Sequence, residues 1–273
     1  MQGMDIQVIN SDCALSSDGR TAAYLASAKS AEMYKQLGVD LAAVANSHVS
    51  DYGADVIAQT LKTLDTNEVS HTGAGSNLSE AAKPACFIAG GRKIAFLSAS
   101  DTLRAGKAAS GSGAGVLSLR SDLDAVKTAV KTAKAENDFV FVYIHAGIDA
   151  NAVWFDSDQI AWSKALIDAG ADGVIGARST RLQGMEFYKG KLIVYGLGNF
   201  LYDEKTRETG IYKITIAEDG TLSHAFLPCS QSGGKVALCT AAADKNAVFS
   251  RISKYCGNVV KVDADGTIRN NRR

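Results

Sequence analysis

Proline is nearly absent from this 273-residue sequence, in which only Pro84 and Pro228 stand against 26 glycines. Bends must therefore come mostly from Gly, Asn, Asp and Ser. Long apolar runs are missing too, since none approaches the roughly 20 residues that cross a bilayer. The start, MQGMDIQVINSD, has no basic segment followed by an apolar stretch, so no signal peptide is visible. Either the protein is cytosolic, or this chain begins after a removed or omitted leader.

The sequence also lacks net charge. Lys plus Arg and Asp plus Glu number 29 each, which gives a formal net charge of zero. A protein that grips phosphates along a nucleic acid needs a local excess of basic residues, so nucleic acid is not an expected partner. The length is enough to bury a sizeable core, as one large α/β domain or as two small ones.

No CxxC pair occurs among the five cysteines, so neither a zinc knuckle nor a dithiol redox motif is supported. We expect small buried thiols. The alternative is a bridge between Cys229 and Cys239, if the chain is exported to an oxidising compartment.

What the sequence does contain is an alternation of short apolar runs with amphipathic segments of helical length. The alternation predicts strands at 39–45, 85–90, 93–99, 139–147 and 172–177, and helices at 54–66, 122–137 and 156–170. Hairpins follow at 185–200 and 210–229, then a helix around 241–256 and a strand near 259–262. Strand-helix-strand units followed by hairpins predict an α/β protein with mixed sheets and outer helices.

Polar residues follow several predicted strands, at the edge where open α/β sheets bind ligands. These residues are Asn10-Ser11-Asp12, Asn46-Ser47-His48, His145 and the segment from Ala177 to Arg181. Asn, Asp and neutral His can hold a divalent ion, and a His that binds no metal can transfer a proton. The competing interpretations are that His145 is structural and that Asn46 only caps a turn. His224 lies in a hairpin strand and is expected to be structural.

Several phrases, in order along the chain, resemble the bacterial capsule-synthesis family that includes the poly-γ-glutamate proteins CapA and PgsA and is related to calcineurin-like metallophosphatases. They are NSDCALS, LGVDLAAVANSHVSDYG, VSHTGAGSNLSEAAKP, VYIHAG and LIDAGADGVIGARSTRLQGMEFYKGKLIVYGLGNFLYD.

The resemblance implies a metallophosphatase-like, four-layer α/β/β/α sandwich with mixed sheets, formed by a single domain over residues 1–273. Residues 231–273 would add a helix and a strand packed on that domain. The family's early Gly-Asp motif has no counterpart, so we expect its N-terminal strand to be missing. The resemblance also implies an extracytoplasmic or envelope-associated protein.

Mapped residue by residue, the resemblance implies metal ligands at Asp12, Asn46, His48 and His145, with His48 and His145 also as catalytic residues. Where the family has GHHPH, this chain has Gly176-Ala177-Arg178-Ser179-Thr180, which contains no imidazole. Arginine repels a cation but suits a carboxylate or phosphate. We therefore expect a degenerate site that holds at most one divalent metal ion.

We assign substrate binding to Arg178, Arg181, Asn46 and Asn199. The expected partner is an anionic envelope polymer or glutamyl oligomer, such as poly-γ-glutamate. A metal-dependent hydrolase, acting as a phosphoesterase or a γ-glutamyl hydrolase, is the alternative. A third possibility is a structural partner in an envelope assembly. Metal analysis of the purified protein distinguishes the first two.

Overall fold

The computed structural model describes residues 3–20, 22–101, 103 and 106–272. Its contacts divide the chain into two compact units. Unit 1 comprises Met1–Ala146 and Trp162–Val174, and unit 2 comprises Gly147–Ala161 and Ile175–Arg273. The single domain expected over the whole chain stays a prediction.

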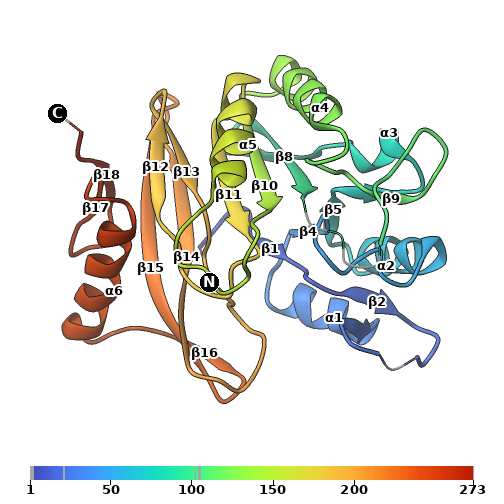
Figure 1. The fold of residues 1–273 in the computed structure, drawn as a ribbon, viewed down its shortest axis with the longest axis horizontal. Coiled ribbons are helices and arrows are strands. Elements are labelled where there is room, and N and C mark those ends of the chain that lie inside the picture. The colour runs from blue at the N-terminus through green and yellow to red at the C-terminus, as the bar shows by residue number, and fades with distance from the viewer. Residues whose placement is uncertain (1–2, 21, 102, 104–105, 273) are drawn as a thin grey trace. The chain divides into compact units, whose positions relative to one another are not determined.

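Unit 1 contains ten strands and four helices among the described residues that belong to it alone. In chain order they are β1 (Val8–Asn10), β2 (Ala14–Ser16), β3 (Leu25–Ser27), α1 (Lys29–Gln36), β4 (Leu41–Ala43), α2 (Ala54–Thr66), β5 (Ser70–Thr72), β6 (Ala74–Gly75), α3 (Leu78–Ala81), β7 (Ala85–Ala89), β8 (Arg92–Ser100), β9 (Gly115–Val116), α4 (Leu123–Glu136) and β10 (Phe139–His145) (Figure 1). Helix α5 (Ser157–Asp168) and strand β11 (Gly173–Ala177) have residues in both units.

The strands of unit 1 pair in both senses. β4 pairs in parallel with β1 on one side and with β5 on the other. β8 pairs antiparallel with β7 and parallel with β10. The β7–β8 hairpin turns at Gly90 and Gly91, whose φ angles of 55° and 72° are those that a tight hairpin turn requires. The predicted α/β class with mixed sheets is confirmed.

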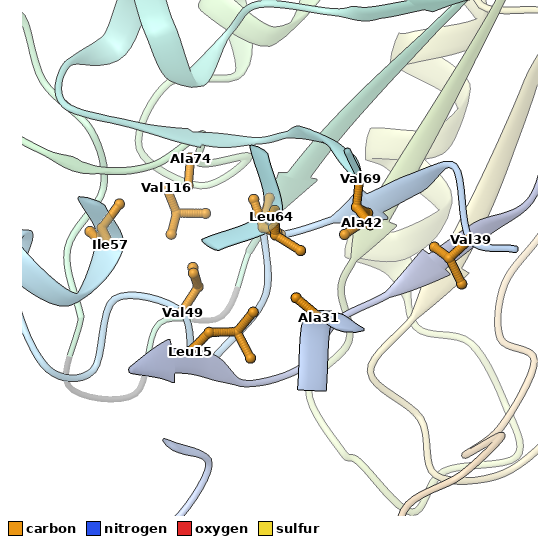
Figure 2. Close-up of a cluster of buried hydrophobic side chains, with 12 residues drawn as sticks. Leu15, Ala31, Val39, Ala42, Val49, Ile57, Leu64, Val69, Ala74 and Val116 are labelled. Atoms are coloured by element: carbon orange, nitrogen blue, oxygen red, sulfur yellow. The ribbon is translucent and has the colours of Figure 1, made fainter. Parts of the chain in front are cut away.

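A core of aliphatic side chains holds the first half of unit 1 together (Figure 2). Helix α2 contributes Ile57 and Leu64, strand β2 contributes Leu15, and strand β4 contributes Ala42, all at most 2% exposed. The helix faces this core with positions three and four residues apart, which is the periodicity that predicted it. This packing fixes the chain on both sides of the turn that follows β4.

Unit 2 consists mainly of hairpins and one helix. Its elements are β12 (Met185–Tyr188), β13 (Lys191–Val194), β14 (Arg207–Ile216), β15 (Leu222–Ser232), β16 (Lys235–Leu238), α6 (Ala242–Tyr255), β17 (Val260–Val262) and β18 (Ile268–Asn270). β12 pairs with β13, β14 with β15, β15 with β16 and β17 with β18, all antiparallel. Phe249 and Ile252 of α6 share a buried cluster with Leu192 and Phe226. The C-terminal helix therefore packs on the hairpins of its own unit (Figure 1).

All five cysteines are thiols in the structure. Cys229 and Cys256 are buried, as expected, and burial raises the pKa of each to about 11. Cys86 is exposed, contrary to the expectation of buried thiols. The reason is its place in β7, where alternate side chains point away from the sheet and into solvent.

Candidate functional site

Four strands of unit 1 end in polar residues that contact one another. β1 leads into Ser11 and Asp12, β4 into Asn46-Ser47-His48, β8 into Asp101, and β10 ends at His145. We call Asp12, Asn46, Ser47, His48, Asp101 and His145 the strand-end cluster. All but Asp12 are buried. The chain thus places amide, imidazole and carboxyl groups at the ends of strands from two sheets, where the sequence predicts a site.

Asn46 makes three hydrogen bonds from a fully buried side chain. Its Oδ1 accepts from the backbone N–H groups of His48 and Val49, each at 3.0 Å, and its Nδ2 donates to the carbonyl of Ser11 at 2.5 Å. These bonds shape the turn after β4 and fasten it to the end of β1. The side chain therefore acts as a structural cap.

His145 forms a hydrogen bond with Ser47 across 98 residues of sequence. The Ser47 Oγ lies 3.2 Å from the His145 Nε2, and both side chains are about 1% exposed. Which of the two groups donates depends on the imidazole tautomer. The bond joins the end of β4 to the end of β10, and it occupies one of the two ring nitrogens of His145.

His48 is held on two sides. Its Nδ1 lies 2.8 Å from the Asp51 Oδ2, and its ring stacks on Tyr24 with the ring centroids 3.5 Å apart and the planes 4° from parallel. Asp51 therefore favours the tautomer with hydrogen on Nδ1, which gives Nε2 a lone pair. Nε2 has no hydrogen-bond partner among the residues that the structure describes. Such an imidazole can accept or donate a proton at one defined atom.

Asp12 carries a buried oxygen without a hydrogen bond. Within the described part of the chain, its Oδ1 is covered and finds no donor. Tyr143 of β10 lies close enough to Asp12 to feel its charge: burial chiefly, and the carboxylate to a smaller extent, raise the pKa of this phenol. Asp12 therefore belongs to the same strand-end region as His145.

These contacts decide how well the cluster suits a divalent ion. Protein hydrogen bonds already engage the Asn46 amide, which caps the turn, and the His145 Nε2, which pairs with Ser47. Across the described ranges, no group of three or more His, Cys, Asp or Glu side chains is placed to hold a metal ion. Zinc, magnesium and related ions take four to six ligands. The described residues of the cluster fit such an ion poorly.

The arginines lie in unit 2, on the loop after β11. Arg178 has a φ of 98°, a backbone conformation that residues with a Cβ rarely adopt. Its Nε donates to the carbonyl of Gly147 at 3.1 Å. The terminal nitrogens of its half-buried guanidinium have no acidic partner among the described residues. A strained backbone at a charged residue is typical of functional positions.

Arg181 and Asn199 belong to the same group of loops. Arg181 is exposed, and its backbone N–H donates to the Ser179 Oγ at 3.1 Å. The Asn199 backbone N–H donates to the carbonyl of Thr180 at 3.2 Å, so the segment after β13 lies against the arginine loop. The structure thus brings the three unit 2 residues of the predicted site together. That they share one pocket with the strand-end cluster stays a prediction.

Some site residues were not among those predicted from the sequence. Asp51 is one, although its place three residues after His48 in a turn was a usable signal. Tyr24 is another, and the pairing of Ser47 with His145 was not predicted either. They depend on contacts between distant segments, which no local pattern encodes.

The fold and these groups define an α/β protein whose candidate ligand-binding side chains lie at strand ends and on the adjoining loops. The family model described as Bacterial capsule synthesis protein PGA_cap matches residues 1–204, and the chain belongs to this family.

Named relatives agree with that assignment. The capsule biosynthesis protein CapA of Bacillus anthracis is 30% identical over 229 residues, which are 81% of this chain and 54% of that protein. The PGA biosynthesis protein CapA of Bacillus subtilis (strain 168) is 30% identical over 201 residues, 71% of this chain and 51% of that protein. A probable polyglutamine synthesis accessory protein of Mycobacterium tuberculosis is 27% identical over 213 residues, which are 73% of this chain and 56% of that protein. The chain spans about half the length of these relatives.

Proposed function

We propose that this chain binds an anionic cell-envelope polymer, such as poly-γ-glutamate, as a capsule-synthesis protein with a degenerate metal site. In this proposal Arg178 and Arg181 take carboxylates of the polymer. The observation that carries it is Arg178: a guanidinium anchored at Nε, without an acidic partner among the described residues, on a strained backbone. A guanidinium that is anchored at Nε keeps its terminal N–H donors available for a carboxylate.

Family membership supports the polymer class. The names of two relatives refer to capsule and PGA biosynthesis, and that of a third to polyglutamine synthesis. A polymer of this kind belongs to the cell envelope, so we propose an envelope location and contact with other envelope proteins. Among the described residues, no helix has the length and apolar character to span a bilayer.

A binding titration with labelled poly-γ-glutamate tests the proposal. We expect the double variant Arg178→Ala, Arg181→Ala to lose at least tenfold in affinity, since two charge-assisted contacts disappear. The control variant Lys235→Ala, Lys245→Ala removes the same charge elsewhere in unit 2 and should bind like the natural chain. Equal loss in both variants, or loss in neither, contradicts the assignment.

A hydrolase is the second candidate, and the geometry of His48 favours it. Asp51 fixes the tautomer of this imidazole and leaves Nε2 able to move a proton. Hydrolysis of phosphoesters or γ-glutamyl amides that is lost in His48→Asn and kept in Ser50→Ala would support an enzyme. A complete lack of hydrolysis leaves the binding function as the better account.

A further inference from the structure

Exposed apolar side chains gather around the arginine loop of unit 2. The exposed fraction is 73% for Ile148, 57% for Trp154 and 50% for Leu201. Phe200 and Tyr202, the sequence neighbours of Leu201, are exposed as well. A single exposed apolar residue is ordinary in a folded protein, whereas several in adjoining loops mark an interaction surface.

Backbone hydrogen bonds join both apolar segments to the loop that carries the arginines. The Thr180 N–H donates to the carbonyl of Ala150 at 2.6 Å, between Ile148 and Trp154 in sequence. The Thr180 carbonyl in turn accepts from the N–H of Asn199, next to Phe200. Thr180 lies between the two arginines in sequence. We call Ile148, Trp154, Arg178, Arg181, Phe200 and Leu201 the arginine–aromatic surface.

A buried glutamine fixes the first apolar segment. Gln183 is 2% exposed, and its Nε2 donates to the carbonyls of Ala152 and Trp154 at 3.3 and 3.0 Å. Its Oε1 accepts from the Nε2 of Gln159 at 3.2 Å. The side chain of Gln183 therefore holds the backbone that carries Trp154 through hydrogen bonds.

A second buried glutamine fixes the other apolar segment. Gln231 of β15 is fully buried, and its Oε1 accepts from the N–H of Tyr202 at 2.8 Å. Its Nε2 donates to the carbonyls of Asp203 and Lys205, both at 2.8 Å. Because both segments are already ordered, a ligand that binds here does not have to order them, which favours affinity.

We infer that the arginine–aromatic surface is a composite subsite for a polyanion whose charges are separated by apolar backbone, such as a glutamyl oligomer. This inference rests on the proposed function and specifies how the polymer is recognised. The arginines pair with carboxylates, and Trp154, Phe200 and Leu201 pack against the methylene groups between them. The chain has zero net charge, and the surface carries two arginines. This charge suits the spaced carboxylates of a glutamyl oligomer better than the dense charge of polyphosphate.

The test compares apolar and cationic variants over a range of salt concentrations. Trp154→Ala and Leu201→Ala should each weaken binding of labelled poly-γ-glutamate roughly tenfold, as anchors of an interface do, with the salt dependence unchanged. Arg178→Ala should make the salt dependence shallower, because fewer counterions are released on binding. Ile88→Ala removes an apolar side chain that is 77% exposed in β7 of unit 1, and it should have no effect.

The two proposals can fail separately. If Trp154→Ala and Leu201→Ala bind like the natural chain while the arginine double variant loses binding, the composite subsite is wrong and the proposed function stands. Polyphosphate has no methylene groups, so if it binds as tightly as poly-γ-glutamate, the role given to the apolar residues of the subsite is wrong. If the natural chain binds no poly-γ-glutamate, the proposed function fails and the subsite fails with it.

Discussion

At the scale of single residues, Asn46 shows how strongly one side chain can organise a turn. Its amide satisfies two backbone N–H groups and one carbonyl inside the protein. Asn46→Ala leaves these groups buried without partners, and we expect the free energy of unfolding to fall by about 2 to 4 kcal/mol. Urea unfolding measures this change.

The control for Asn46 is a second asparagine cap. Asn77 accepts from the N–H of Glu80 at the start of α3, in a more exposed position. Asn77→Ala should lower the free energy of unfolding by about 1 kcal/mol or less. Equal losses at the two positions would contradict the structural role given to Asn46.

Arg178 allows a test of backbone strain that is separate from charge. Its φ of 98° suits glycine and strains any residue with a Cβ. Both Arg178→Gly and Arg178→Ala remove the guanidinium, but the glycine variant should be more stable than the alanine variant by about 1 to 2 kcal/mol. At Arg181, where φ is not positive, glycine should bring no such gain. Matching urea midpoints for the two Arg178 variants would argue against the strain.

The sequence placed the candidate residues at strand ends but did not determine their partners. Asn46 and His48 follow β4 as predicted, because an apolar run that stops at polar residues is a local signal. The cap made by Asn46, the bond from Ser47 to His145 and the stacking of Tyr24 on His48 depend on tertiary contacts. The sequence therefore identified the region of the site, but it did not reveal which contacts its polar side chains make.

At the scale of elements, His224 links two long strands of unit 2. Its Nδ1 in β15 lies 2.7 Å from the hydroxyl of Tyr212 in β14. Burial chiefly, and Lys191 to a smaller extent, lower the pKa of His224 to about 4. The expected structural role of this histidine agrees with these contacts, since only the neutral ring accepts the phenol hydrogen.

The lowered pKa predicts a dependence of stability on pH. In the unfolded chain the pKa of histidine is near 6.5, so from about pH 6.5 down to about 4 the unfolded state binds a proton that the folded state does not. The free energy of unfolding should therefore fall as the pH is lowered through this window, by up to about 3 kcal/mol. Urea midpoints of the natural chain and of His224→Gln should converge as the pH falls. A constant difference across the window would contradict the assignment.

Elements with clear local signals were predicted well. Helix α2 has the bounds expected from its apolar spacing, and the hairpins expected at 185–200 and 210–229 form as β12–β13 and β14–β15. Helix α1 was not predicted, because KSAEMYKQ is short and mostly polar and buries only Ala31. Strand β4 is shorter than the apolar run 39–45, since that run continues buried beyond the ladder.

At the scale of the whole molecule, the chain has no net charge and spans about half the length of its relatives. The proposed binding of a polyanion therefore relies on local cationic groups, because the overall field gives no attraction. The central proposal is that guanidinium groups hold the polymer in this member of the family without a metal ion.

Calorimetric titration of the natural chain with poly-γ-glutamate, with and without a strong chelator, tests that claim most directly. We predict the same dissociation constant in both conditions, since neither Arg178 nor Arg181 requires a metal to bind a carboxylate. Binding that disappears with the chelator and returns when zinc or manganese is added would contradict the account.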